Sequence, residues 1–232
     1  MAKRFFLVGL VFLAASLPVA RADEPQYMAI FMDDVKVGHA VSQRKVAGAE
    51  VTHSQTMKLT IARGSMAMAV TVTTDMTETT AGTPLRFSYE AMLGGMGGMK
   101  KSGVIRNGQM TVTTEQFGTP TEQTVPYPAG ALMPEAATRL MKAKGAKPGT
   151  KYTYVAFDPE SLGGLKTEVL IGKPVRVPLI GQATAELIPV NVTVNHQGTP
   201  LAMQMFFDKQ FEARKMEMSA MHFFCSIDSL RQ

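Results

Sequence analysis

Apolar and polar residues alternate one by one along most of this chain, in short runs separated by Gly, Asn, Asp and Pro. Between residues 51 and 61, Val51, Met57, Leu59 and Ile61 share one face, and Thr, Ser and Lys occupy the other. From residue 66 to 73, Met and Val again alternate with Ala and Thr. A period of two is typical of antiparallel strands with one buried and one solvated face.

An Asn-Gly pair at residues 107–108 is a strong signal for a hairpin between two such runs. Further strands are predicted at residues 27–32, 37–46, 85–92, 152–157, 167–171, 185–194, 201–207 and 211–218. Consecutive hairpins predict a meander. The predicted fold is therefore mainly β: a single curved antiparallel sheet or half-barrel meander with one main amphipathic helix.

That helix is predicted where the period changes, in the segment ALMPEAATRLMKAKG. Pro134 suits a first helical turn, Gly145 suits the position after the last turn, and Lys142 and Lys144 suit the negative end of the helix dipole. Apolar residues recur there at helical spacing: Met133, Ala136, Ala137, Leu140 and Met141.

The first 22 residues have the parts of a cleavable secretory signal. Lys3 and Arg4 precede an apolar run from Phe5 to Ala15, and the segment ends in Ala20-Arg21-Ala22. We expect cleavage after Ala22, a single β-rich domain over residues 23–232, and a bacterial periplasmic location. The apolar run is too short to span a bilayer, and no membrane span is predicted.

Loss of the signal also changes the charge. Lys3, Arg4 and Arg21 leave with it, so the formal net charge of +5 becomes +2 (5 − 3). This gives little support for nucleic-acid binding, which needs clustered cations on one face. Cys225 is the single cysteine, so no internal disulfide can form.

Two longer phrases carry a resemblance to a known family. YMAIFMDDVKVGHA (residues 27–40) and PYPAGALMPEAATRLMKAKGAKPGTKYTYVAFDPESL (residues 126–162) resemble exported bacterial β-domains that occur alone or before transglutaminase-like domains. In outline such domains are similar to LolA- and LppX-type periplasmic carriers, which implies a curved sheet around an apolar cavity plugged by helices. Only seven residues follow Cys225, so we expect no transglutaminase-like catalytic domain in this chain.

The motifs of common enzymes are not found in the sequence. Cys225 and His222 would face opposite sides of a strand, and the four histidines lack metal-ligand spacing. Asp158 and Glu160 are interpreted as a polar strand end before a turn. We therefore predict no enzymatic activity and no cofactor.

Methionine is unusually frequent, with 17 residues after Met1. Thioether side chains can fill an ordinary core, line an adaptable apolar pocket, or bind Cu(I). The candidates for lining an apolar ligand are Met57, Leu59, Met66, Met68, Val70, Met203, Met205 and Phe207.

The glycine-rich stretch MLGGMGGMKK is predicted to be a loop between two strands, the second beginning near Val104. Met92, Met96 and Met99 are candidates for a lid over a cavity mouth, or alternatively for a Cu(I) site.

Three functional hypotheses follow. The leading one is a non-enzymatic periplasmic binding protein for an acyl chain, a lipid or another apolar molecule. The alternatives are a structural or adaptor module that binds an envelope protein, and a methionine-rich Cu(I)-binding protein.

Overall fold

A computed structural model describes residues 24–32, 35–63, 66–94, 97–116, 118–179, 182–196, 198–218 and 223–226. These ranges contain sixteen strands and one helix. The first eight strands are β1 (Gln26–Met32), β2 (Val35–Ala47), β3 (Glu50–Arg63), β4 (Met66–Thr79), β5 (Pro84–Leu93), β6 (Gly98–Arg106), β7 (Gln109–Gln116) and β8 (Thr119–Pro126). They are followed by β9 (Ala131–Leu132), α1 (Pro134–Lys144), β10 (Lys151–Asp158), β11 (Gly163–Ile171), β12 (Val175–Leu179), β13 (Gln182–His196), β14 (Thr199–Phe207), β15 (Ala213–Met218) and β16 (Phe223–Ser226).

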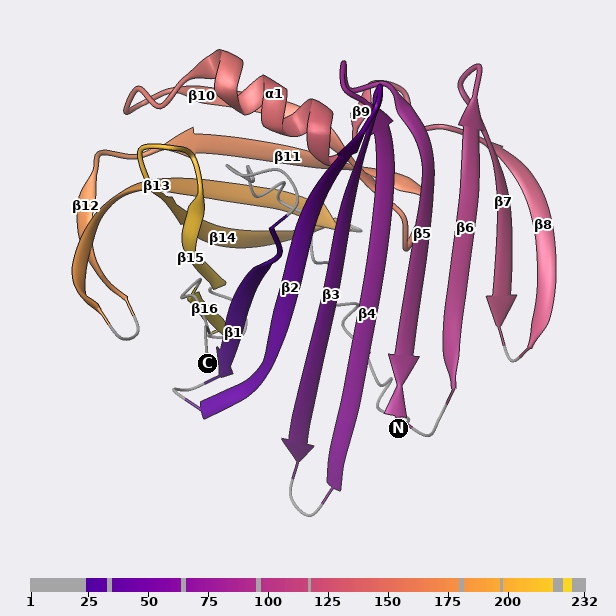
Figure 1. Cartoon of the computed structure of the whole chain (residues 1–232), viewed down its shortest axis with the longest axis horizontal. Coiled ribbons are helices and arrows are strands. Elements are labelled where there is room, and N and C mark those ends of the chain that lie inside the picture. Colours follow the sequence, from indigo (N-terminus) through magenta and orange to yellow (C-terminus); the bar gives the residue numbers. More distant parts are fainter. Residues whose placement is uncertain are drawn as a thin grey trace.

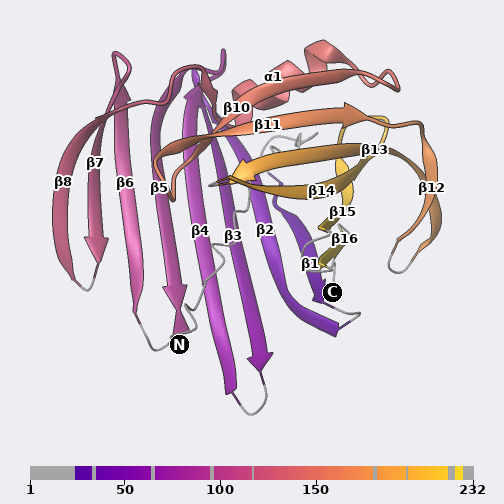
Figure 2. The ribbon, with the colours of Figure 1, turned by 180° about the vertical axis from the view of Figure 1, so that it is seen from behind.

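The strands form one strongly curved sheet (Figure 1). Its order runs β8-β7-β6-β5-β4-β3-β2-β1-β16-β15-β14-β13-β11-β10-β9, and β12 pairs with β13. The predicted meander is thus confirmed for β1 to β8, and β16 joins the C-terminal strands to β1. Figures 1 and 2 show β10, β11, β13 and β14 crossing the long strands β2 to β5 at a steep angle. The sheet does not close, because β8 and β9 end the described strand order without pairing to each other.

Two apolar clusters fill the space enclosed by this curve. The larger joins the inner faces of β1 to β4 to those of β10 to β15 and includes Met57, Leu59 and Met205. The smaller packs Phe87 and Met110 against Phe157, with the Phe87 and Phe157 rings 5.1 Å apart in an edge-on contact. Alternating apolar residues on facing strands therefore form the core, as their period predicts.

Helix α1 has the predicted bounds. Pro134 begins it, and Gly145 follows its last turn at a φ of 72°, with its N–H bonded to the carbonyls of Met141 and Lys142. The helix lies above β10 and β11 in Figure 1, at one end of the enclosed space. Within the described ranges, no helix has the length and hydropathy needed to cross a membrane.

The structure differs from the sequence prediction in several strands, since β9, β12 and β16 were not predicted. The chain enters β6 at Gly98, not near Val104, so Met92 and Met99 are strand residues and the connecting loop is only residues 94–97. Strand β8 was not predicted, because its eight residues are polar or proline except for Val125 and show no alternation. Pro120 and Pro126 suit an edge strand, since neither can donate a ladder hydrogen bond.

The turn between β4 and β5 packs directly against α1. Gly82 has a φ of 90°, and a Cβ atom placed there would lie 2.9 Å from the Ala136 Cβ. Gly48, in the turn between β2 and β3, also has a positive φ, of 61°, but a Cβ there would meet no atom within 4 Å.

This difference provides a matched test of the contact between turn and helix. Gly48→Ala should cost about 1 kcal/mol of unfolding free energy, for backbone strain alone. Gly82→Ala should cost about 1–3 kcal/mol more, because the new methyl group collides with the helix. Urea denaturation of both variants measures the difference, and equal losses would contradict the close packing of Gly82 against Ala136.

Candidate functional site

The space beneath α1 is the candidate site. Here the underside of the helix meets the inner face of β10 to β14 around a cavity of about 30 Å³. Its wall is apolar and aromatic and is formed by Ala137, Met141, Tyr152, Tyr154, Val169, Val190, Val192, Met205 and Phe207. A cavity of this size holds a water molecule or two, whereas ligand pockets measure about 300–1,000 Å³. A larger guest would therefore require the helix or the side chains to move.

Two stacked tyrosines carry hydroxyl groups into this apolar wall. The rings of Tyr152 and Tyr154 on β10 lie 6.4 Å apart. Burial raises the pKa of Tyr152 to about 12 and also raises the pKa of Tyr154. Both hydroxyls therefore stay neutral at ordinary pH. The Tyr154 side chain is hydrogen-bonded to Thr167, and the Tyr152 hydroxyl can hydrogen-bond to a guest without adding charge.

The helix begins on a carboxylate that comes from the sheet. Met133 precedes the first turn and offers no capping side chain. Instead, Glu78 at the end of β4 accepts hydrogen bonds from the N–H groups of Glu135, at 2.5 Å, and Ala136, at 3.0 Å. Free N–H groups at a helix start need acceptors, and Glu78 supplies them from 57 residues away. Burial raises the pKa of Glu78 to about 7, although these two donors oppose the rise.

The side chain of Glu135 points back to the sheet and forms the second part of this anchor. Arg44 on β2 donates to it through Nε at 2.9 Å and Nη2 at 3.0 Å, and His53 Nε2 on β3 lies 3.0 Å from Oε2. Burial would raise the pKa of Glu135, but the bonds from His53 and Arg44 outweigh it and hold the pKa at about 2. We refer to Arg44, His53, Glu78 and Glu135 as the polar tether.

Most ligand-lining candidates whose side chains are described lie in the core, and only two of them lie around this cavity. Met57, Leu59, Met203, Met205 and Phe207 are buried in the larger cluster, and Val70 packs against it. Among them, Met205 and Phe207 line the cavity. Met68 is half-buried on β4, and the side chain of Met66 lies outside the described part.

The methionines of the glycine-rich stretch are not brought together. Met92 pairs with Gly98 and Ala91 pairs with Met99, so Met92 and Met99 face opposite sides of the sheet. Met92 is 37% exposed, and Met96 lies outside the described residues. This arrangement offers no shared thioether site for Cu(I) from Met92 and Met99.

The other candidate residues have structural surroundings. Asp158 accepts hydrogen bonds from the backbone N–H groups of Glu160 and Ser161, as expected for a strand end before a turn. The side chains of Cys225 and His222 lie outside the described part of the chain. Among the described residues, no group of three or more His, Cys, Asp or Glu side chains is placed to hold a metal ion.

The sequence prediction missed the polar tether and the tyrosines. A signal for the tether was present, because Glu78 and Arg44 fall on the inner faces of β4 and β2, in register with Val51 and His53. A charged residue on an otherwise buried face needs a partner, but the partner comes from a distant segment.

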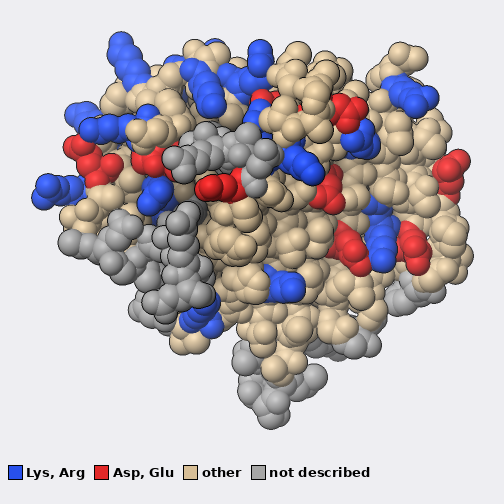
Figure 3. Space-filling view, viewed as in Figure 1, with Lys and Arg blue, Asp and Glu red and all other residues tan. Residues whose placement is uncertain are grey.

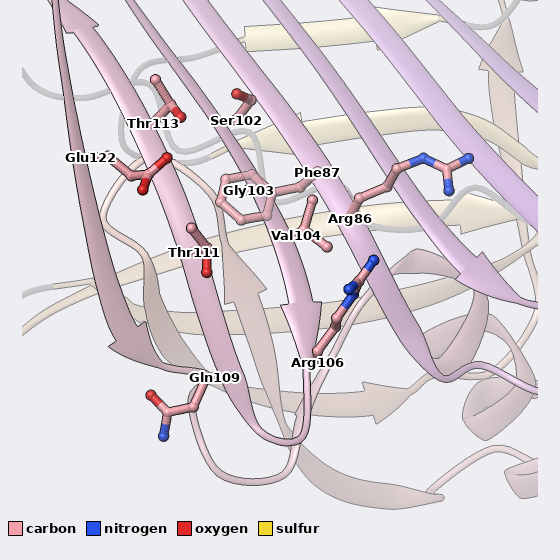
Figure 4. A pocket seen from close by; sticks show the side chains of 10 residues that line it. All are labelled: Arg86, Phe87, Ser102, Gly103, Val104, Arg106, Gln109, Thr111, Thr113 and Glu122. Carbon is pink, nitrogen blue, oxygen red and sulfur yellow. The ribbon is translucent and has the colours of Figure 1, made fainter.

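A second hollow, of about 510 Å³, lies on the outer face of β5 to β8 (Figure 4). Arg86, Arg106 and Glu122 contribute charged groups, Thr111 and Thr113 contribute hydroxyls, and Val104 is also exposed there. Arg86 is already bound to Glu50, with Nη2 donating to Oε2 at 2.7 Å. This hollow is larger and more open than the space beneath α1.

The described geometry defines the class as an open, β-barrel-like antiparallel sheet with one helix over the end of its interior. No protein-family model and no curated protein matches the chain. Among solved structures, it is similar to a β-barrel-like protein of the domain of unknown function DUF1849 from Brucella abortus. The match has a TM-score of 0.66 and 14% identity, and it covers 90% of this chain and 97% of that one. At this identity the likeness establishes the fold alone.

The raised pKa of Glu78 predicts how stability depends on pH. The folded state holds this proton more tightly than the unfolded chain does, so stability should fall as the pH rises from about 4.5 through about 7. In Glu78→Gln the loss of unfolding free energy over this pH range should be smaller by about 1–3 kcal/mol, because the amide does not titrate. Urea denaturation at about pH 5 and about pH 8 measures it. Glu90→Gln, on the outer face of β5, should leave the wild-type profile in place, and an unchanged profile in Glu78→Gln would contradict the assignment.

Arg44→Ala should cost about 1.5–3 kcal/mol of unfolding free energy, since it leaves a buried carboxylate with half its partners. The control is Arg86→Ala, which breaks an ion pair whose side chains are 50% and 43% exposed. Such a pair contributes little to stability because water solvates both partners. Equal losses in the two variants, measured by urea denaturation, would show that the tether does not hold the helix.

Proposed function

We propose that this protein is a non-enzymatic binding protein of the bacterial periplasm that takes an acyl chain or another apolar guest beneath α1. The observation that carries the proposal is the cavity at the contact between helix and sheet, because its wall combines aliphatic, thioether and aromatic groups with neutral hydroxyls. Ligand sites in proteins have this composition: mostly apolar, with a few polar groups that fix orientation.

The contacts that hold α1 on the sheet support the proposal that the helix lifts to admit a guest. Its buried residues are Pro134, Glu135, Thr138 and Met141, and two of the four are polar. The first turn of the helix is held by hydrogen bonds and charge at Glu135 and Ala136, which water can replace when the helix lifts. A helix attached by a wide apolar face would expose that face to water on opening. This exposure would cost about 25 cal/mol of free energy per Å² of apolar surface.

The side chains beneath the helix also suit a change of shape. Met57, Met203 and Met205 are buried near it. Unbranched thioether side chains have several accessible rotamers and repack around differently shaped guests. We infer that the small cavity is the closed, empty form of a larger site.

The described serine side chains with carboxylate partners are Ser54, Ser88 and Ser161. Within the described ranges, Ser54 and Ser88 both donate to Asp75, and Ser161 donates to Asp158. No serine in these ranges is hydrogen-bonded to a histidine, so a nucleophile and its base are not paired there.

The chain contains no tryptophan, so a single introduced tryptophan can report on the guest. Phe207 lines the cavity, whereas its neighbour Phe206 is buried on the opposite face of β14 with Val177 and Leu187. A brominated fatty acid quenches tryptophan on contact. We expect it to quench Phe207→Trp in a saturable manner and to leave Phe206→Trp almost unchanged.

The two positions are 2% and 6% exposed, so differences in solvent access are minimal. The same fatty acid without bromine should quench neither variant and should compete with the brominated one. Native mass spectrometry of wild-type protein should show the added mass of the acid. Equal quenching of both variants, or none in either, would count against a guest beneath α1.

A further inference from the structure

The segment that closes the interior carries a concentration of positive charge. From residue 136 to 157 there are five cations and no Asp or Glu. Backbone hydrogen bonds from Gly149 to Ile171 and from Ile171 to Thr150 bring the end of β11 alongside, and Lys173 follows it. We call this set the basic face; it consists of Arg139, Lys142, Lys144, Lys147, Lys151 and Lys173.

All six side chains are exposed, and none forms an ion pair with an acidic residue of the described part. Some exposed cations elsewhere have such partners: Lys100 with Glu90, Lys166 with Glu168, and Lys209 with Glu186. Others have no ion pair in the described part but are distributed over β2, β3, β6 and β12: Lys36, Lys45, Lys58, Arg106 and Arg176. Figure 3 shows Lys and Arg gathered along the upper edge, over α1 and the loop that follows it. The charge at this end is therefore uncompensated, and it is concentrated in a segment without Asp or Glu.

Local structural roles explain only part of this set. Lys142 and Lys144 lie in the last turn of α1, where they offset the helix dipole. Arg139 donates to the carbonyl of Thr80 in the turn beneath the helix. Lys147, Lys151 and Lys173 lie beyond the helix and make no such contact in the described ranges. Six like charges on one end repel one another, so an arrangement of this kind favours an anionic partner.

We propose that the basic face docks the protein on a lipid surface rich in anionic headgroups, with α1 toward that surface. Two observations favour a membrane over an acidic protein. None of the six cations lines either of the two hollows described above, and they lie on the helix that covers the apolar interior and on the chain beyond its C-terminal end. Each exposed Lys or Arg near an anionic bilayer strengthens binding roughly fivefold. The proposal extends the proposed function by naming where an acyl guest would enter or leave.

The test is co-sedimentation of the purified protein with vesicles of phosphatidylcholine, with and without phosphatidylglycerol. Wild-type protein should bind the anionic vesicles at low salt and be released by added salt, because the Debye length shortens. The triple variant Lys142→Gln, Lys144→Gln, Lys147→Gln should bind on the order of 100-fold more weakly. The control triple Lys100→Gln, Lys166→Gln, Lys209→Gln has the same net charge and should bind like wild type.

Failure to bind anionic vesicles at low salt would overturn the proposal, and so would equal loss in the two triples, which would point to net charge alone. Binding of an oligoglutamate peptide without binding of vesicles would overturn it in favour of an acidic protein partner. Quenching of Phe207→Trp by a soluble brominated fatty acid, repeated in the background of the first triple, should be unchanged. Docking and guest binding can therefore fail separately.

Discussion

The open ends of the sheet are the constraint on which the rest of this structure depends. A curved antiparallel sheet encloses an apolar face, and where its end strands do not meet, that face must be covered by another element. Strand β9 is only two residues long, so the sheet stops early at that end. Helix α1 follows directly and covers the space, with Met141 joining the larger apolar cluster. The same constraint makes the cover a separate element, one that can move without disturbing the strand ladder.

The polar tether decides how firmly that cover is held. Glu78 and Glu135 are both buried carboxyl groups, yet their pKa values are displaced in opposite directions. The cause is the difference in their partners, because Glu135 meets two side chains that can carry positive charge, whereas Glu78 meets backbone N–H groups. Once Glu78 ionises, two negative carboxylates lie at the start of one helix. The anchor of α1 is therefore sensitive to pH in the neutral range, whereas the apolar core is not.

The strands and the helix could be predicted because their signals are local. Alternation places Met57, Leu59, Met203 and Met205 inside, and the Asn107-Gly108 turn joins β6 to β7 with both residues at positive φ, of 51° and 73°. Strand β8 has no apolar face, so its sequence pattern does not predict a strand. It is a strand because its backbone pairs with β7. The contacts of the candidate site are also invisible locally, since Arg44 and His53 meet Glu135 across 91 and 82 residues. A charged residue on a buried face indicates that a partner exists, but the topology decides which one.

The distribution of charge would give the molecule a preferred orientation on an anionic surface. At physiological ionic strength the Debye length is about 8 Å, so exposed charges farther than this from a surface contribute little to attraction. Some strand lysines are paired with glutamates and nearly cancel beyond that distance, and the unpaired strand cations are distributed over β2, β3, β6 and β12. The unpaired cations of the basic face instead lie together at the end of the molecule that carries α1. An anionic surface would therefore attract the end of the molecule that carries α1 more than its other faces, even with a small overall net charge. This orientation would bring the covering helix, rather than a wall of the sheet, to the boundary between water and lipid.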